Sequence, residues 1–236
     1  MLTLSASVAC MNPLTYRETI PALDAEGLSA YHFDICDGHF ARTFLLYPGL
    51  LSHLRSITSR RLDVHLYCVR PSWYLDEFIA SGADTIIVHG EAEEDPRPVI
   101  ERILARGVGA GLAYLPTTPV PDSVRALLPS LRVVVANSVG PAYAGQAFDP
   151  RGLANMRRLR DLAVAIGKPL EVAADGSVRE DRLADFFAAG SDHLVLGTSS
   201  VFAASGDPIA AFRAFRRVAE AAFSARATRS AREERT

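Results

Sequence analysis

The stretch AYHFDICDGHF, residues 30–40, begins like a buried strand and yet contains two histidines and two aspartates. Its first six residues are mostly apolar and aromatic, which predicts a buried β-strand. His32 and Asp34 are two positions apart, so they share one face of that strand. Asp37 and His39 follow in an Asp-Gly turn, where a turn-forming role is the better interpretation. The pair within the strand therefore needs a functional reason to point inward.

Seven further apolar runs alternate with amphipathic stretches along the chain. This alternation predicts repeated strand and helix units around a parallel sheet. The predicted strands are Leu4–Ala9, Ala30–Ile35, Leu62–Leu66, Thr85–Val88, Val108–Ala113, Val133–Ala136, Leu170–Ala174 and His193–Leu196. The amphipathic stretches include Trp73–Ser81, Pro96–Arg106, Leu153–Ala165 and Arg179–Ala189.

Eight strands, eight crossovers and no break in composition predict one domain of the α/β class, a single (β/α)8 TIM barrel rather than an open sheet. A length of 236 residues suits such a domain. We expect the barrel to cover residues 1–223. The last segment, SARATRSAREERT at 224–236, has alternating charges and no apolar periodicity, which predicts a flexible, solvated tail.

The composition favours small-molecule chemistry. Hydrophobic residues make up 49% of the chain and the net charge is only -2, which argues against disorder and against a nucleic-acid-binding surface. We see no secretion signal and no apolar run near the roughly 18 residues of a membrane span, so we expect a cytoplasmic protein without a membrane partner. Cys10, Cys36 and Cys68 lack metal-finger spacing, which predicts buried thiols rather than disulfides.

Polar side chains lie at the predicted carboxyl ends of three strands, where barrels of this kind place their active sites. His32 and Asp34 are on the second strand, His65 ends the third in LDVHL, and Asp175 closes the seventh in VAADGS. Each alone could be a hydrogen-bonded core histidine or a loop cap. Four together favour a site for Zn²⁺, Mn²⁺ or Fe²⁺. Asp63 either orients His65 or bonds elsewhere in the barrel, and both interpretations stay open.

Three glycine-bearing turns follow the late strands: AGQ at 144–146, DGS at 175–177 and GTSS at 197–200. Each alone is a tight turn. Their exposed backbone N–H groups, together with the start of a short helix expected after the eighth strand, predict a site for a phosphate dianion. The long loop GPAYAGQAFDP at 140–150 adds small residues beside it.

A metal between carboxylates on the second and seventh strands, with a phosphate site beside it, suits an epimerisation. One carboxylate removes the proton α to a ketone and the other returns a proton from the opposite face. That proton is weakly acidic, so the reaction needs a metal to polarise the ketone and stabilise the enediolate. The expected catalytic pair is Asp34 and Asp175.

These motifs carry a family resemblance over about residues 4 to 205. YHFDICDGHF resembles the H-x-D-x-M-D-G-x-F segment of the ribulose-phosphate 3-epimerase family. LDVHL, GADTIIVHGEA, VGPAYAGQAF, ADGSV and LGTSSVF follow in the family's order. ACMN near the N-terminus, and DGS instead of the commoner D-G-G, look closer to the allulose-6-phosphate 3-epimerase branch.

The resemblance implies one divalent ion per subunit, foremost Zn²⁺ and otherwise Mn²⁺, Fe²⁺, Co²⁺ or Mg²⁺, and a homo-oligomer. It implies His32, Asp34, His65 and Asp175 as metal ligands, and Asp34 and Asp175 as the acid/base pair. It also implies a set of substrate and phosphate contacts: Ser7, His65, Ala142, Tyr143, Ala144, Gly145, Gly176, Ser177, Gly197, Thr198 and Ser199.

The chain departs from the family pattern around the sugar. Three methionines that family members usually place against the bound sugar are replaced here by Cys36, Tyr67 and Asn137. The family loop N/D-P-G-F-x-G-Q reads GPAYAGQ at 140–146. Replacing apolar thioethers by a phenol and an amide should change which hydroxyl patterns fit and how the enediolate is shielded from water.

The expected activity is that of a metal-dependent 3-epimerase acting on a ketose phosphate of the ribulose 5-phosphate or allulose 6-phosphate type. A Schiff-base aldolase needs a lysine at the carboxyl end of a strand. Lys168, the only lysine, precedes its strand, and related decarboxylases need an Asp-x-Lys-x-x-Asp arrangement that is absent. A non-catalytic sugar-phosphate-binding barrel is the other alternative, and retention of both aspartates and both histidines argues against it.

Overall fold

Eight parallel strands form a closed barrel in the computed structural model, which describes residues 1–141, 145–203 and 206–233. Each strand pairs with its neighbours in chain order, and β8 returns to pair with β1. The predicted (β/α)8 barrel and its eight strands are thus confirmed. The strands are β1 (Thr3–Ser7), β2 (Ala30–Cys36), β3 (Arg61–Tyr67), β4 (Thr85–His89), β5 (Gly109–Tyr114), β6 (Val133–Asn137), β7 (Glu171–Asp175) and β8 (His193–Leu196).

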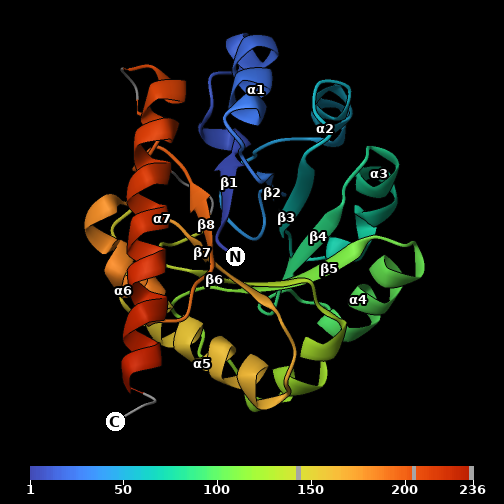
Figure 1. The fold of residues 1–236 in the computed structure, drawn as a ribbon. Coiled ribbons are helices and arrows are strands. Elements are labelled where there is room, and N and C mark those ends of the chain that lie inside the picture. Colours follow the sequence, from blue (N-terminus) through green and yellow to red (C-terminus); the bar gives the residue numbers. More distant parts are fainter. Residues whose placement is uncertain (142–144, 204–205, 234–236) are drawn as a thin grey trace.

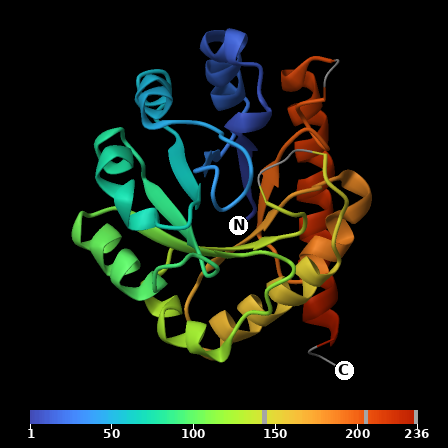
Figure 2. The same cartoon turned by 180° about the vertical axis from the view of Figure 1, so that it is seen from behind.

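Helices surround the barrel in both views (Figure 1), and Figure 2 shows the same ring from behind. The α-helices of the described residues are α1 (Tyr16–Ala25), α2 (Pro48–Arg55), α3 (Leu75–Ala80), α4 (Pro96–Ala105), α5 (Arg151–Ala165), α6 (Leu183–Ala188) and α7 (Pro208–Glu233). Shorter 3₁₀ helices are Val8–Cys10, Pro13–Thr15, Pro71–Trp73, Asp122–Ala126, Leu128–Ser130 and Glu180–Arg182.

Local sequence explains where these helices begin and end. α4 begins with Pro96 after Asp95, whose side chain accepts a hydrogen bond from Arg97 N at 2.9 Å. α4 ends at Ala105, and Gly107 follows with a positive φ of 75°, which glycine adopts readily at the end of a helix. The β5–β6 crossover lacks an α-helix and contains only 3₁₀ turns. The prolines of this crossover interrupt helical hydrogen bonding. They are Pro116, Pro119, Pro121 and Pro129.

The alternation of strand side chains divides the interior from the outer core. Tyr31, Phe33 and Ile35 of β2 belong to the large core between strands and helices. His32 and Asp34 lie on the other face, inside the barrel, where the register puts Asp34 beside His65 of β3. Apolar side chains fill part of that interior: Ile87, Ala113, Val133, Val135 and Ala173. The polar pair of β2 thus points into the barrel lumen.

The predicted tail begins as helix. α7 continues through residues 224–233, and Arg226 in this segment donates to the carbonyl oxygen of Ser191 at 3.0 Å. Alanine and arginine favour helix intrinsically, so the lack of apolar periodicity does not end α7 at residue 223. Residues 234–236 lie outside the described part of the chain.

The short helix expected after β8 is a hydrogen-bonded turn instead. The carbonyl oxygen of Gly197 accepts from the backbone N–H groups of Ser200, Val201 and Phe202 at 3.0 to 3.2 Å. These three bonds to one oxygen close a turn, and they do not form the successive hydrogen bonds of a helix. Among the described residues, no helix has the length and apolar character needed to cross a membrane.

Candidate active site

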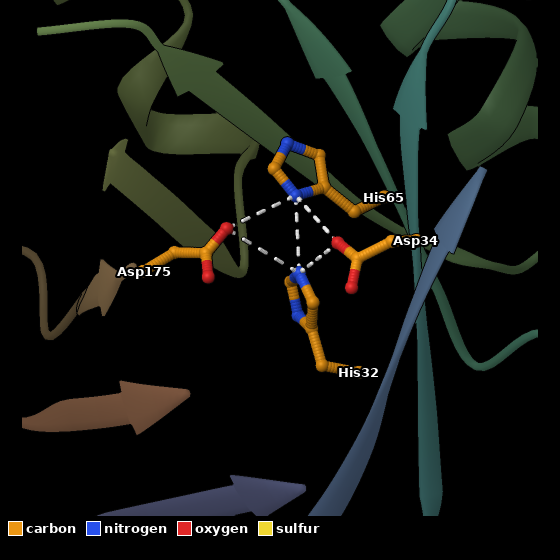
Figure 3. Close-up of side chains that lie close together, drawn as sticks. All are labelled: His32, Asp34, His65 and Asp175. Atoms are coloured by element: carbon orange, nitrogen blue, oxygen red, sulfur yellow. Dashed lines mark hydrogen bonds and ion pairs between the residues drawn. The ribbon is translucent and has the colours of Figure 1, made fainter. Parts of the chain in front are cut away.

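Four side chains from three strands converge inside the barrel mouth (Figure 3). Ligand atoms of His32, Asp34, His65 and Asp175 all lie within 4.8 Å of one another. His32 Nε2 is 3.2 Å from Asp34 Oδ1 and 3.9 Å from Asp175 Oδ2. His65 Nδ1 is 3.6 Å from Asp34 Oδ1 and 3.7 Å from Asp175 Oδ2. The structure therefore brings together all four residues that the sequence predicts as metal ligands.

The donor set fits a divalent transition metal. It offers two imidazole nitrogens and two carboxylate oxygens, a mixture that suits Zn²⁺, Mn²⁺, Fe²⁺ and Co²⁺. The two nitrogens, His32 Nε2 and His65 Nδ1, approach to 3.0 Å. Both histidines are buried, whereas Asp34 and Asp175 keep 13% and 15% of their side chains exposed. The cluster could hold one cation that is also open to a substrate.

Each carboxylate directs one oxygen at the histidines. On Asp34 the cluster oxygen is Oδ1, and Oδ2 accepts a hydrogen bond from Ser7 Oγ at 3.0 Å. On Asp175 the cluster oxygen is Oδ2, which also accepts from Tyr67 and Asn137 at 3.1 and 3.0 Å. No described residue forms a hydrogen bond to Asp175 Oδ1. Each carboxylate thus has a second oxygen directed away from the histidines.

Burial is the largest single influence on the pKa of each of these groups, because it penalises their charged forms, but at two of them the neighbouring charges and hydrogen bonds together outweigh it. It lowers the pKa of His65 to about 3. In His32 the charge and hydrogen bond of Asp34 outweigh burial and raise the pKa to about 9. The same histidines outweigh burial at Asp34 and lower its pKa. Burial raises the pKa of Asp175, where His32 opposes the shift and Asp34 adds to it. A bound cation would favour the ionised carboxylates.

A cavity of about 130 Å³ opens beside the cluster. Ser7, Asp34, Tyr67 and Asp175 line its inner wall, and Cys10 and Gln146 also reach it. The residues predicted to hold phosphate line the outer part: Gly145, Gly176, Ser177, Gly197, Thr198 and Ser199. The predicted contacts Ala142, Tyr143 and Ala144 lie outside the described residues. One pocket thus joins the carboxylates to all three glycine-bearing turns, and the phosphate role of those turns stays a prediction.

The DGS turn after β7 requires its glycine. Gly176 has φ of 93°, and a Cβ there would lie 2.3 Å from Val139 Cγ2. Ser177 also has positive φ, 52°, and its hydroxyl accepts from Arg182 Nη1 at 2.6 Å. This turn is therefore held in a left-handed conformation that favours glycine, and both of its residues line the cavity.

The three positions that depart from the family pattern lie in different surroundings. Tyr67 lines the cavity, and Asn137 lies directly behind it, with its Nδ2 2.7 Å from the Tyr67 hydroxyl. Cys36 is not among the residues lining the cavity, and its Sγ is 3.5 Å from the carbonyl oxygen of Ala41. Tyr67 and Asn137 are therefore the departures that contact Asp175 of the cluster.

Two aspartates singled out from the sequence have structural roles. Asp37 Oδ1 accepts from His39 N and Phe40 N, both at 2.8 Å, which confirms the turn interpretation. Asp63 accepts from Arg61 Nε at 3.0 Å, and among the described residues no hydrogen bond or ion pair joins it to His65. The second interpretation of Asp63, a bond elsewhere in the barrel, is therefore correct.

Sequence reasoning missed a histidine behind the cluster. His89, at the end of β4, places its Nε2 2.9 Å from His65 Nε2. Its Nδ1 is 3.0 Å from Glu91 Oε2, and Glu91 Oε1 accepts from Leu115 N at 2.7 Å. The signal was present in VHGE at 88–91, a histidine ending a strand with a carboxylate two residues later. A carboxylate and a histidine thus support His65 from behind.

Comparison with known proteins assigns the family. The model of the ribulose-phosphate 3 epimerase family matches residues 3–202. The chain belongs to the ribulose-phosphate 3-epimerase family. It is accordingly an isomerase of the epimerase type. A ribulose-phosphate 3-epimerase of Synechocystis sp. is 33% identical over 189 residues, covering 78% of this chain and 80% of the relative. One of Mycobacterium tuberculosis is 32% identical over 201 residues, covering 85% and 86%.

Solved structures agree with this chain in fold. A 3-hexulose-6-phosphate synthase superposes with a TM-score of 0.66 and 17% identity, covering 92% of this chain and 99% of the other. A thiamine phosphate pyrophosphorylase from Pyrococcus furiosus gives 0.62 and 18%, covering 94% and 96%. At this identity the likeness shows the barrel alone.

Proposed function

We propose that the chain is a metal-dependent 3-epimerase of a ketose phosphate, with ribulose 5-phosphate as the first candidate substrate. The observation that carries this proposal is the pairing of Asp34 and Asp175 across one metal-ligand cluster, both lining the same cavity. Relatives named ribulose-phosphate 3-epimerase support the candidate sugar. Allulose 6-phosphate is the alternative, suggested by the DGS and ACMN motifs.

The two aspartates exchange roles with the direction of reaction. One carboxylate takes the proton from C3, and the other delivers a proton to the opposite face of the same carbon. Their oxygens outside the cluster, Asp34 Oδ2 and Asp175 Oδ1, are the ones available for this work, and Ser7 holds the first of them. A divalent cation bound by His32, Asp34, His65 and Asp175 would supply the Lewis acidity that such a weak carbon acid requires.

The glycine-bearing turns would fix the other end of the substrate. Gly145, Gly176 and Gly197 lie on three different loops around the cavity, and all three line it. Backbone N–H groups in such turns suit a phosphate dianion, which would anchor the sugar so that C3 stays between the carboxylates. Zn²⁺ is the first candidate for the cation because the ligand set mixes nitrogen and oxygen at four positions.

A substrate panel in D₂O tests the proposal. Metal-loaded protein is incubated with ribulose 5-phosphate, allulose 6-phosphate and related ketose phosphates, and both kcat/KM and deuterium at C3 are measured. We expect epimerisation of at least one sugar with solvent deuterium at C3. A protein that binds these sugars without any exchange at C3 would be the non-catalytic barrel instead, and the proposal would be wrong.

A further inference from the structure

Two residues from separate strands meet at one oxygen of Asp175. The Tyr67 hydroxyl of β3 lies 3.1 Å from Asp175 Oδ2, and Asn137 Nδ2 of β6 lies 3.0 Å from the same oxygen. Asn137 Nδ2 is also 2.7 Å from the Tyr67 hydroxyl. The three groups form a closed triangle. Asn137 is the register partner of Asp175, whereas β3 and β6 are not neighbours in the barrel.

The donors in this triangle have one consistent assignment. An amide nitrogen carries two protons, so Asn137 donates one to Asp175 and the other to Tyr67. The hydroxyl of Tyr67, having accepted that bond, directs its own proton at Asp175. Two donors therefore converge on Oδ2, which is also the oxygen that faces His32 and His65.

Packing fixes the donors in place. The centroid of the Tyr67 ring lies 4.2 Å from that of His65, 4.6 Å from that of His89 and 5.9 Å from that of Phe40. Tyr67 is 4% exposed and Asn137 is fully buried. Asn137 Oδ1 has no hydrogen-bond partner among the described residues, a cost that a purely structural amide would avoid.

Asp34 is held differently. Its single side-chain hydroxyl donor, Ser7, binds Oδ2, the oxygen outside the cluster. On Asp175 both donors bind the cluster oxygen and leave Oδ1 without a partner among the described residues. The donor to Asp34 thus binds the oxygen outside the cluster, whereas the donors to Asp175 bind the cluster oxygen. A change at Tyr67 should therefore affect Asp175 far more than Asp34.

We propose that Tyr67 and Asn137 are positioning residues for Asp175. They hold Oδ2 toward the metal ligands, so that Oδ1 is the oxygen that carries the proton at C3. This inference rests on the proposed function, since it assigns a role within the same two-carboxylate reaction. It gives the phenol and the amide at these positions a task that an apolar thioether could not perform.

Tyr67→Phe tests the inference because it removes one hydroxyl and keeps the ring. In D₂O we measure the deuterium in recovered substrate and the amount of product formed. The ratio of the first to the second reports how often the intermediate returns to substrate instead of going on to product. From the epimer whose product is protonated by Asp175, we expect this ratio to rise about tenfold, since one hydrogen bond to a charged group is lost. From the other epimer the ratio should fall, because Asp34 is then the faster donor.

Chelator competition provides a second readout that does not require turnover. We expect Tyr67→Phe to weaken metal affinity about tenfold, as losses behind metal ligands commonly do. Tyr31→Phe, which removes a buried phenol of β2 that bonds Ile20 and Asp24 in the outer core, is the matched control and should leave both deuterium ratios and the metal affinity unchanged.

The outcomes separate the two proposals. Wild-type protein without C3 exchange refutes the epimerase function itself. Wild-type exchange with an unchanged metal affinity in Tyr67→Phe refutes only the positioning role, as do ratios that stay constant or move in the same direction from both epimers. Opposite shifts together with weaker metal binding support it.

Discussion

In the proposed reaction Asp34 and Asp175 each bind the metal through one oxygen and carry a proton on the other, and substitution by asparagine tests whether both carboxylates take part. Asparagine keeps the size of the side chain but loses the charge and the ability to accept a proton from C3. We expect Asp34→Asn and Asp175→Asn each to fold and to lose roughly 10² to 10⁴-fold in kcat/KM at saturating metal. Steady-state assays and thermal unfolding curves measure both effects.

The same substitution at a surface aspartate is the control, because it removes a carboxylate charge away from the proposed chemistry. Asp161 is an exposed residue of α5 that does not line the cavity, so Asp161→Asn should retain the wild-type kcat/KM. Near-full activity in either cluster variant would show that one carboxylate suffices, and the assignment of two acid/base residues would have to be given up.

At the scale of elements, residues at and after the end of β4 support His65, a candidate metal ligand on β3. With His65 Nδ1 turned to the cluster, its Nε2–H can donate to His89 Nε2, and His89 Nδ1–H can then donate to Glu91. This order of donors fixes the tautomer that leaves His65 Nδ1 free for a cation. Glu91→Gln should therefore weaken metal affinity by about 10 to 100-fold, as measured by chelator competition.

Glu93 offers the control for this chain of contacts. It lies two residues further on, pairs with Arg70 at 3.2 Å, and is 60% exposed. Glu93→Gln should therefore bind metal as the wild type does. Equal affinities in Glu91→Gln and wild type would mean that His65 is oriented by its packing against Tyr67 and His89 rather than by the carboxylate.

For the whole molecule, the parts that sequence could predict are those with a local signature. Apolar runs and strand-end His and Asp residues identify the barrel and the cluster, because parallel strands in a closed barrel share one mouth. The contact of Tyr67 with Asn137 was not predictable, since it joins non-adjacent strands and depends on barrel diameter. The continuation of α7 past residue 223 follows helix propensity, which periodicity alone overlooks.

The opposite end of the barrel lumen carries an ion-pair network that links strands distant in the chain. Arg61 of β3 donates to both carboxylate oxygens of Glu171 on β7, at 2.7 and 2.8 Å. His193 Nδ1 of β8 is 3.1 Å from Glu171, and its Nε2 is 2.8 Å from Ser5 Oγ of β1. The Glu171 carboxylate of β7 thus contacts β3 and β8 directly, and β1 joins the network through His193. Substitution of Glu171 therefore tests how much this network stabilises the barrel.

Burial alone would raise the pKa of Glu171, but hydrogen bonds and charges from His193 and Arg61 outweigh it and lower the pKa. A group with a lowered folded-state pKa stabilises the fold above its unfolded pKa, about 4.3 for Glu, and loses that contribution as the pH falls. Glu171→Gln should therefore lower the unfolding free energy by about 1.5 to 3 kcal/mol at pH 7. The difference from wild type should shrink steadily below about pH 4.5.

Urea unfolding from pH 7 to pH 3 measures this difference, with chelator in every sample so that loss of metal does not contribute. Glu101→Gln, on the exposed side of α4, is the control and should give a small difference that does not vary with pH. A Glu171→Gln difference that stays constant down to pH 3 would mean that the carboxylate charge contributes nothing. The barrel would then be closed by its strand ladders and apolar core, and the network around Arg61 would serve only to satisfy buried polar groups.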